Sequence, residues 1–255
     1  MIKNKYNKIQ NIRRLLRNNA PCVGTFIQLS DPNSLEIISD NNYSWIALDL
    51  EHGNINISNL SSLVRVVENS KSLPIVRLGS SSEYECKKVL ESGAAGVIVP
   101  MVKNVIQLKK IYNYCAWPPK GHRGVGYSRA NLYGKYFNDY QKYLSQKPLF
   151  IAMVENKECL DNLSELMQLD FVDAFFIGPY DLSASLNVTG NFKNKLFLKS
   201  IDNIKRLSKK YKKPIGIHLI EPNNKKLKKI IKEGFSFVAY SLDTVFIQHN
   251  SYFKI

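Results

Sequence analysis

The class of fold is indicated by one apolar run that ends in two acids and a histidine, Trp45-Ile46-Ala47-Leu48-Asp49-Leu50-Glu51-His52-Gly53. An uninterrupted run of large and β-branched side chains is typical of a strand buried on both faces. Parallel α/β folds place their chemistry at the carboxyl ends of such strands. We therefore expect polar residues at the ends of other strands as well.

Strand-like and helix-like segments alternate eight times along the chain. The predicted strands are residues 23–27, 45–50, 73–78, 96–100, 149–154, 172–177, 214–219 and 235–241. An opening helix is expected over residues 2–18, and a short apolar tail after the last strand. Eight βα units in 255 residues predict a single TIM (β/α)8 barrel domain spanning residues 1–255. A doubly wound sheet is the alternative, but no G-x-G-x-x-G follows the first strand.

Composition and charge narrow the function classes. The hydrophobic fraction of 44% and the charged fraction of 22% are ordinary for a soluble globular protein. The formal net charge of +15 resides largely in lysines of helix-like stretches, without a nucleic-acid-binding motif. We expect a solvated basic surface that attracts anionic substrates, and no nucleic-acid partner.

The spacing of the cysteines and the hydropathy of the chain indicate in which cellular compartment the protein is expected. The four cysteines are widely scattered and form no C-x-x-C pair. No signal peptide and no window of about 18 apolar residues is present, so no membrane partner is expected. The sequence predicts a cytoplasmic protein with reduced thiols.

Polar residues stand at the predicted strand ends. They are Asp49, Glu51, His52, Arg77, Glu155, Asp181 and His218. Carboxyl ends of parallel strands meet at one end of a barrel, so we expect these side chains to converge on one mouth.

Glu155 and Asp181 follow adjacent predicted strands. Two carboxylates, with water completing the coordination, suit a hard divalent cation such as Mg²⁺ or Mn²⁺. The alternative is that either acid caps a helix, as Asp181 before Leu182-Ser183 could do.

His52 and Arg77 are candidates for proton transfer and for charge stabilisation. Histidine exchanges protons near neutral pH, and the neighbouring carboxylates could orient His52, although a lone loop histidine is more often structural. Arg77 follows a buried run, so it should meet a carboxylate, either of a substrate or of Glu51.

Two glycine-containing segments are candidates for loops of the site. The backbone of Gly178-Pro179-Tyr180-Asp181 opens toward a helix and could hold a substrate carboxylate, or it is an ordinary turn. The long segment 116–139, with Gly121-His122-Arg123-Gly124, follows no strand and is a weak phosphate loop. We expect it to form a mobile loop over the barrel mouth.

Taken together, several motifs resemble the HpcH/HpaI family of class II pyruvate aldolases over roughly residues 23–244. The motifs are Leu48-Asp49-Leu50-Glu51-His52, Val76-Arg77, the segments 93–102 and 117–126, Val154-Glu155, and Phe176-Ile177-Gly178-Pro179-Tyr180-Asp181-Leu182-Ser183-Ala184-Ser185. The segment around Gly178 is the most specific of them.

The resemblance implies a barrel of the phosphoenolpyruvate/pyruvate type, commonly a hexamer with exchanged terminal helices. It implies reversible cleavage of a 4-hydroxy-2-oxo acid to pyruvate and an aldehyde, with Mg²⁺, Mn²⁺ or Co²⁺ as cofactor. Glu155 and Asp181 would bind the metal, His52 would act as acid and base, and Arg77 would hold the pyruvate oxygens. Asp49 would position His52, and the backbone of residues 178–181 would receive the pyruvate carboxylate.

Two positions depart from the family pattern. Glu91 stands where many members have an aspartate paired with the histidine, so we expect it to support His52. His218 stands where an apolar residue commonly faces the aldehyde, which predicts a polar or acidic aldehyde; a satisfied core histidine is the alternative.

Two other functions fit parts of the sequence. The same fold and enolate chemistry could serve a lyase acting on a CoA ester. A catalytically idle basic barrel could bind nucleic acid or an acidic polysaccharide, although the set of His52, Arg77, Glu155 and Asp181 disfavours it.

Overall fold

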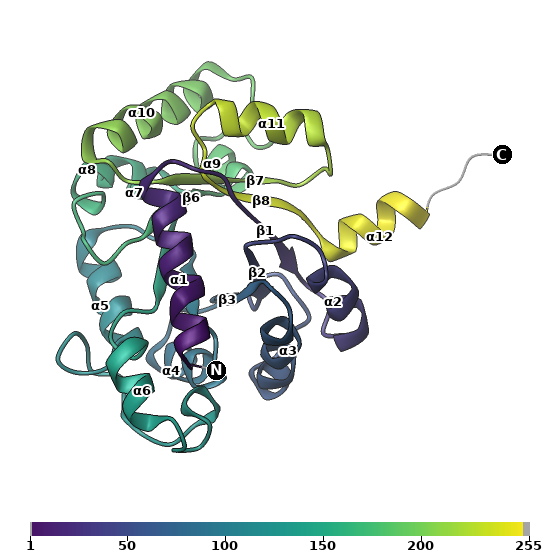
Figure 1. The fold of residues 1–255 in the computed structure, drawn as a ribbon. Coiled ribbons are helices and arrows are strands. Elements are labelled where there is room, and N and C mark those ends of the chain that lie inside the picture. Colours follow the sequence, from purple (N-terminus) through teal and green to yellow (C-terminus); the bar gives the residue numbers. More distant parts are fainter. Residues whose placement is uncertain (1, 252–255) are drawn as a thin grey trace.

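The computed structural model describes residues 2–251, and it shows a closed barrel of eight parallel strands in the order β1 to β8 (Figure 1). The strands are β1 (Cys22–Ile27), β2 (Trp45–Asp49), β3 (Leu73–Arg77), β4 (Gly96–Val99), β5 (Leu149–Val154), β6 (Ala174–Ile177), β7 (Ile215–Leu219) and β8 (Phe237–Leu242). The predicted TIM barrel is confirmed, with each strand within a few residues of its expected place.

Helices surround the strands and also cover one end of the barrel. They are α1 (Ile2–Arg17), α2 (Pro32–Ser39), α3 (Ile57–Asn69), α4 (Glu83–Glu91), α5 (Val105–Cys115), α6 (Phe137–Tyr143), α7 (Lys157–Asp161), α8 (Leu163–Leu166), α9 (Pro179–Ser185), α10 (Lys195–Tyr211), α11 (Asn224–Lys232) and α12 (Asp243–Ser251), with a 3₁₀ turn at Arg129–Asn131. Within the described residues, no helix is long and apolar enough to cross a membrane.

Side chains alternate between the inside of the barrel and the surrounding helices, because successive residues of a strand point to opposite faces. Along β2, Ile46 and Leu48 pack in the outer core with the helices, whereas Trp45 and Ala47 belong to the inner core. The Trp45 ring stacks on Phe237 of β8 with the ring centroids 4.3 Å apart. A side chain at Gly24 would overlap the Trp45 ring, so glycine is required there. The same alternation points Asp49 inward.

Helix α1 closes the end of the barrel at which the strands begin (Figure 1). Its buried Ile9, Ile12 and Leu16 belong to the inner core together with Leu73 and Leu149, the first residues of β3 and β5. The prediction of an opening helix is therefore confirmed. Helix α1 covers the inner core at the end of the barrel where the strands begin.

Polar contacts fix α1 in this position. Arg13 donates from Nε and Nη2 to the two carboxylate oxygens of Asp173, at 2.7 and 3.0 Å. Lys5, which is buried, pairs with Glu68 at the end of α3, and Arg129 pairs with the same carboxylate. These ion pairs join four parts of the chain that are far apart in sequence: α1, the end of α3, Arg129 and Asp173.

The long segment 116–139 lies at the end of the barrel where the strands begin, and not over the mouth at their carboxyl ends. It follows α5, and helices of a βα barrel run back toward the beginnings of the strands. Arg129 in this segment donates to the Ser92 carbonyl oxygen after α4, and α6 packs against α1. The prediction of a loop over the mouth is wrong, because a segment that follows a helix lies at the opposite end from one that follows a strand.

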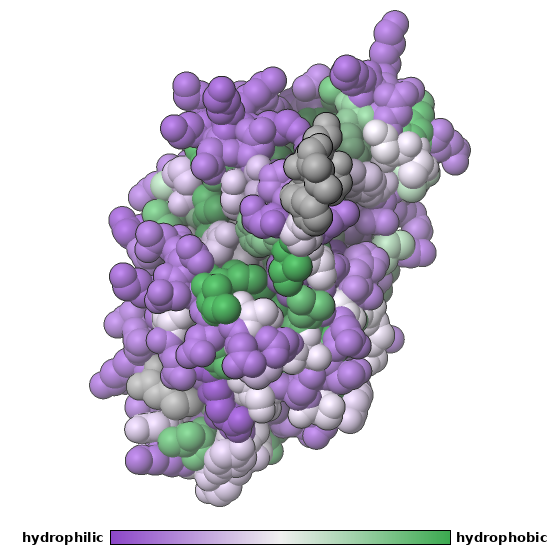
Figure 2. Space-filling view, turned by 90° about the vertical axis from the view of Figure 1, so that its right-hand side faces the viewer, coloured by the Kyte–Doolittle hydropathy of each residue, from purple (hydrophilic) through white to green (hydrophobic). Residues whose placement is uncertain are grey.

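The chain after β8, where we expected a short apolar tail, forms helix α12. Helix α12 extends away from the barrel (Figure 1). On the side of the molecule that faces the viewer in Figure 2, hydrophobic residues gather near the middle of a largely polar surface. Helices α2 and α12 each expose a large isoleucine, Ile37 and Ile247. Contiguous exposed apolar groups commonly mark interaction surfaces.

Candidate active site

An ion-paired arginine lies at the carboxyl ends of β2 and β3. Arg77 donates from Nε to Asp49 Oδ1 at 2.8 Å and from Nη2 to Asp49 Oδ2 at 2.6 Å. Its Nη1 is 3.2 Å from Glu51 Oε2. The expectation that Arg77 meets a carboxylate is confirmed, although Asp49 is its closer partner. Burial disfavours a charged Asp49, but hydrogen bonds and charge from Arg77 hold the pKa of Asp49 below its usual range.

Asp49 also organises the loop that carries His52. Its Oδ1 accepts the backbone N–H groups of Glu51 at 3.1 Å and His52 at 3.3 Å. Gln28 at the end of β1 donates to its other oxygen at 3.3 Å. One buried carboxylate thus fixes both Arg77 and the turn after β2.

His52 is the most exposed member of this group, with 57% of its side chain accessible to solvent. Its Nε2 lies 3.9 Å from Glu51 Oε2, and the same oxygen is 3.2 Å from Arg77 Nη1. Burial raises the pKa of Glu51, although the charge of Arg77 opposes that effect. At 3.9 Å a proton could pass between Glu51 and His52 only through a bridging water, and the exposed His52 ring faces solvent.

Glu155 is a buried carboxylate at the end of β5, with 2% of the residue exposed. Its Oε1 accepts the backbone N–H of Met101, which follows β4. Burial, together with the negative charges of Glu51 and Asp181, raises its pKa to about 7, although the Met101 N–H and the charge of Arg77 oppose this shift. A carboxylate that is this costly to ionise, with other acids close by, is where a cation would be favourable.

The segment after β6 covers Glu155. Gly178 precedes α9, and a side chain at this position would place its Cβ 2.9 Å from Glu155 Oε2. Glycine is therefore required for the close approach. Pro179 begins α9, the Tyr180 ring is exposed and packs edge-on against Phe192 at 5.1 Å, and Asp181 lies exposed in the first turn.

Within residues 2–251, no group of three or more His, Cys, Asp and Glu side chains is arranged to hold a metal ion. Glu155 and Asp181 are close enough for the charge of one to affect the other. Two carboxylates fit a hard cation only when water or substrate oxygens complete the coordination, as the sequence predicted. A cavity of about 460 Å³ is lined in part by Met101, Lys103 and Asn156, which follow β4 and β5, but not by Glu155 or Asp181 themselves.

His218 lies half-buried on β7, on the inner side of the barrel. Its ring stacks on Phe26 with a centroid distance of 5.0 Å, and Nε2 is 3.1 Å from the Ser241 carbonyl oxygen. Burial lowers the pKa of His218 to about 4, so the imidazole is neutral at physiological pH. The Arg77 guanidinium lies over the same Phe26 ring at 4.9 Å. His218 thus has the contacts of a satisfied histidine close to Arg77.

Glu91 is far from this group within one chain. It is the last residue of α4, which runs back toward the beginnings of the strands. Four residues later, the Ala95 N–H donates to the carbonyl oxygen of Pro74, near the start of β3. His52 follows the opposite end of β2. The prediction that Glu91 supports His52 is therefore wrong for a single chain, because α4 ends beside the beginnings of the strands and His52 lies at their carboxyl ends.

Three contributors to the site were missed from the sequence. Phe26 lies between Arg77 and His218, Met101 donates its backbone N–H to Glu155, and Gln28 donates to Asp49. Phe26 is indistinguishable from a core residue in the sequence. Met101 and Gln28 directly follow predicted strands, so their position was a usable signal.

Comparison with known proteins identifies the family. The chain belongs to the HpcH/HpaI aldolase/citrate lyase family, whose profile matches residues 23–250. It is 28% identical over 238 residues to the hydroxypyruvate/pyruvate aldolase of Roseobacter denitrificans, covering 92% of this chain and 91% of that protein. It is 30% identical over 232 residues to the 2-keto-3-deoxy-L-rhamnonate aldolase of Escherichia coli K12, covering 90% of this chain and 86% of that protein.

Solved structures share the fold. A HpcH/HpaI aldolase/citrate lyase family protein from Burkholderia cenocepacia J2315 superposes with a TM-score of 0.88 at 22% identity, covering 94% of this chain and 96% of that one. A citrate lyase β subunit from M. tuberculosis, solved with oxaloacetate and magnesium, gives a TM-score of 0.59 at 13% identity, covering 91% and 95%. At these identities the likeness concerns the fold alone.

Proposed function

We propose that this protein is a metal-dependent class II aldolase that reversibly cleaves a 4-hydroxy-2-oxo acid into pyruvate and an aldehyde. The observation that carries the proposal is the buried Glu155, with a pKa of about 7, next to the Arg77–Asp49 ion pair and to Asp181. Membership of the aldolase family and the names of the relatives support the reaction class.

The residues of the chain have distinct parts in this scheme. Arg77, held by Asp49, faces the negative charge that develops on the 2-oxo oxygen as the C3–C4 bond breaks. His52 takes the proton of the 4-hydroxyl group, with Glu51 beside it, and the aldehyde forms. The bonding electrons pass into the enolate of pyruvate, which then takes up a proton at C3. The backbone of residues 178–181 would hold the pyruvate carboxylate.

Glu155 and Asp181 would hold the cation, either Mg²⁺, Mn²⁺ or Co²⁺. When bound, the ion would supply electrophilic stabilisation of the enolate charge. The magnesium in the M. tuberculosis citrate lyase β subunit supports a divalent ion in this fold. His218 would face the aldehyde, and its polar ring would favour a polar or acidic one.

Assembly and compartment form a second part of the proposal. We infer that the protein is a cytoplasmic homo-oligomer, a hexamer or trimer of dimers, that acts on small molecules. All four cysteines are buried free thiols, which supports a reducing compartment. The exposed isoleucines of α2 and α12 support self-association.

A pyruvate-release assay over a panel of 4-hydroxy-2-oxo acids tests the reaction. We expect release that stops in chelator, returns with added divalent metal, and falls about 100-fold or more in Glu155→Gln. Activity that survives both chelation and this substitution would contradict the metal assignment. Cleavage of CoA thioesters alone would favour the related lyase. Salt-dependent binding of an anionic polymer without any lyase activity would favour an idle barrel.

A further inference from the structure

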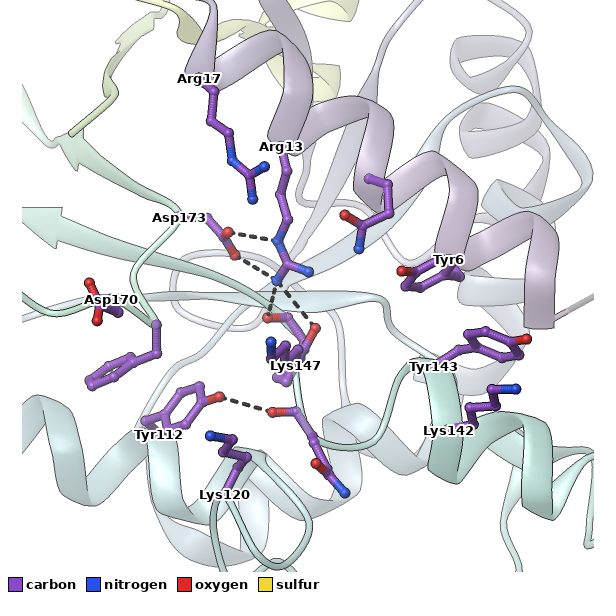
Figure 3. Close-up of a pocket in the computed structure, with 14 residues that line it drawn as sticks. Tyr6, Arg13, Arg17, Tyr112, Lys120, Lys142, Tyr143, Lys147, Asp170 and Asp173 are labelled. Carbon is purple, nitrogen blue, oxygen red and sulfur yellow. Dashed lines mark hydrogen bonds and ion pairs between the residues drawn. The ribbon is translucent and has the colours of Figure 1, made fainter. Parts of the chain in front are cut away.

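A second cavity lies at the opposite end of the barrel from the candidate active site. It has a volume of about 730 Å³ and is bordered by α1, α6 and the segments that precede β5 and β6 (Figure 3). Small-molecule sites commonly enclose roughly 300–1,000 Å³. None of the residues assigned to the aldol chemistry borders this cavity. The proposed aldol reaction therefore does not account for the side chains that line this cavity.

The lining of the cavity carries more cations than acids. Five lining residues are basic and two are acidic; the basic ones are Arg13, Arg17, Lys120, Lys142 and Lys147, and the acidic ones are Asp170 and Asp173. Asp173 is fully engaged, because it accepts two hydrogen bonds from Arg13 and one from the Phe150 N–H. Positive charge in a concave surface concentrates the electrostatic potential and attracts anions.

Three of these cations are free to meet a ligand, whereas Lys142 Nζ lies over the Tyr143 ring, 5.3 Å from its centroid. Within the described chain, Arg17, Lys120, Lys142 and Lys147 form no ion pair with a carboxylate. Figure 3 shows Arg17 coming from α1 and Lys120 from the loop after α5, on opposite sides of the cavity. Their charges approach one volume from different directions, which suits a compact anion with several negative oxygens.

The cavity also has aromatic walls. Tyr6 of α1 and Tyr143 of α6 are half-buried, with ring centroids 5.1 Å apart and planes inclined by 47°. Tyr112 is stacked on Phe171 at 4.2 Å on the other side. Aromatic faces next to cations accept a planar ring as well as a charged group.

We propose that this cavity is a second ligand site, which binds a compact polyphosphate anion, either an inorganic polyphosphate or the triphosphate of a nucleotide. Arg17, Lys120 and Lys147 would contact the phosphate oxygens, and Tyr6 and Tyr143 would contact the base of a nucleotide. A nucleic-acid polymer fits less well, because its backbone needs cations along an extended groove, whereas these converge on one cavity.

Calorimetric titration of the full chain in metal-free buffer tests the site, with tripolyphosphate, adenosine triphosphate and neutral adenosine as probes. We expect both polyphosphates to bind and adenosine alone not to bind. The double variant Lys120→Gln/Lys147→Gln should weaken binding by at least about tenfold, which corresponds to about 1.4 kcal/mol. The matched control Lys225→Gln/Lys228→Gln removes the same charge from α11, outside the cavity, and should change affinity less than about twofold.

Tyr143→Leu separates the two sources of the polyphosphate. A loss of affinity for adenosine triphosphate alone identifies a nucleotide site, and unchanged affinity for both probes identifies an inorganic polyphosphate site. The thermal midpoints of the lysine variants without ligand should match that of the parent, since both lysines are exposed. The proposal is overturned if neither polyphosphate binds, if the control variant loses as much affinity, or if a short single-stranded RNA binds more tightly than both probes.

Discussion

Replacing Glu155 by glutamine should make the metal-free protein more stable at alkaline pH. Burial raises the pKa of Glu155 from 4.5 to about 7. The folded protein therefore retains this proton over a pH range in which the unfolded chain has lost it. Stability from this group is complete below about pH 4.5 and is lost as the pH rises toward 7.

The magnitude follows from the two pKa values. A difference of about 2.5 in pKa corresponds to roughly 3 kcal/mol, because one pKa unit is worth about 1.4 kcal/mol. Between pH 5 and pH 8, Glu155 should cost the parent protein about 2–3 kcal/mol of unfolding free energy. Glutamine has nearly the same shape and does not titrate, so Glu155→Gln should not lose this unfolding free energy as the pH rises.

Urea unfolding of both proteins in EDTA, at several values between pH 5 and pH 8, measures the difference. Added Mg²⁺ or Mn²⁺ should then stabilise the parent at pH 8 and leave Glu155→Gln unchanged, because only a ligand bound to the folded state shifts the equilibrium. The reasoning is refuted if the two proteins show parallel pH profiles in EDTA. Equal stabilisation of both proteins by metal would show that the ion does not bind at Glu155.

Three further substitutions test the surroundings of this carboxylate. Asp49→Asn should cost about 3 kcal/mol in urea unfolding, because the buried Arg77 guanidinium loses its two-point ion pair and keeps only the contact with Glu51. Glu233→Gln, in an exposed pair with Lys205, should cost less than about 1 kcal/mol. Arg77→Lys should lower kcat for pyruvate release by about 100-fold, because a lysine cannot keep both oxygens of Asp49 and also face the substrate; a kcat within threefold of the parent would contradict this. The parent protein should lose about 2 kcal/mol of unfolding free energy as the pH falls from 7 to 5, because the pKa of His218 is about 4 in the folded protein and 6.5 in the unfolded chain. His218→Phe should abolish this loss. An unchanged profile of stability against pH would show that His218 is not buried as a neutral ring.

Much of the site could be predicted from strand direction alone. Asp49, Arg77 and Glu155 end buried runs, and the alternation of side chains along a strand points all three into the barrel. Because parallel strands end at one mouth of the barrel, the convergence of these three side chains could be predicted without the family resemblance. The sequence therefore predicted the acids and the arginine, and the resemblance supplied their proposed roles.

Other features depend on packing that a single sequence does not show. The stack of Arg77 and His218 on Phe26 joins three strands whose registers are set by the closed barrel. Helix α12 has no clear apolar face, so its residues gave no helical period. Glu91 and the segment 116–139 were misplaced for the same reason: each belongs to the part of a βα unit that returns to the beginnings of the strands.

The position of α1 has a consequence for synthesis of the chain. Helix α1 leaves the ribosome well before β5 and β6, yet Arg13 binds Asp173, which is made 160 residues later. Closing so long a loop is entropically costly until the intervening strands have assembled. We therefore expect α1 to dock late in co-translational folding, with the apolar side chains of Ile9, Ile12 and Leu16 open to chaperones until β5 and β6 have been made.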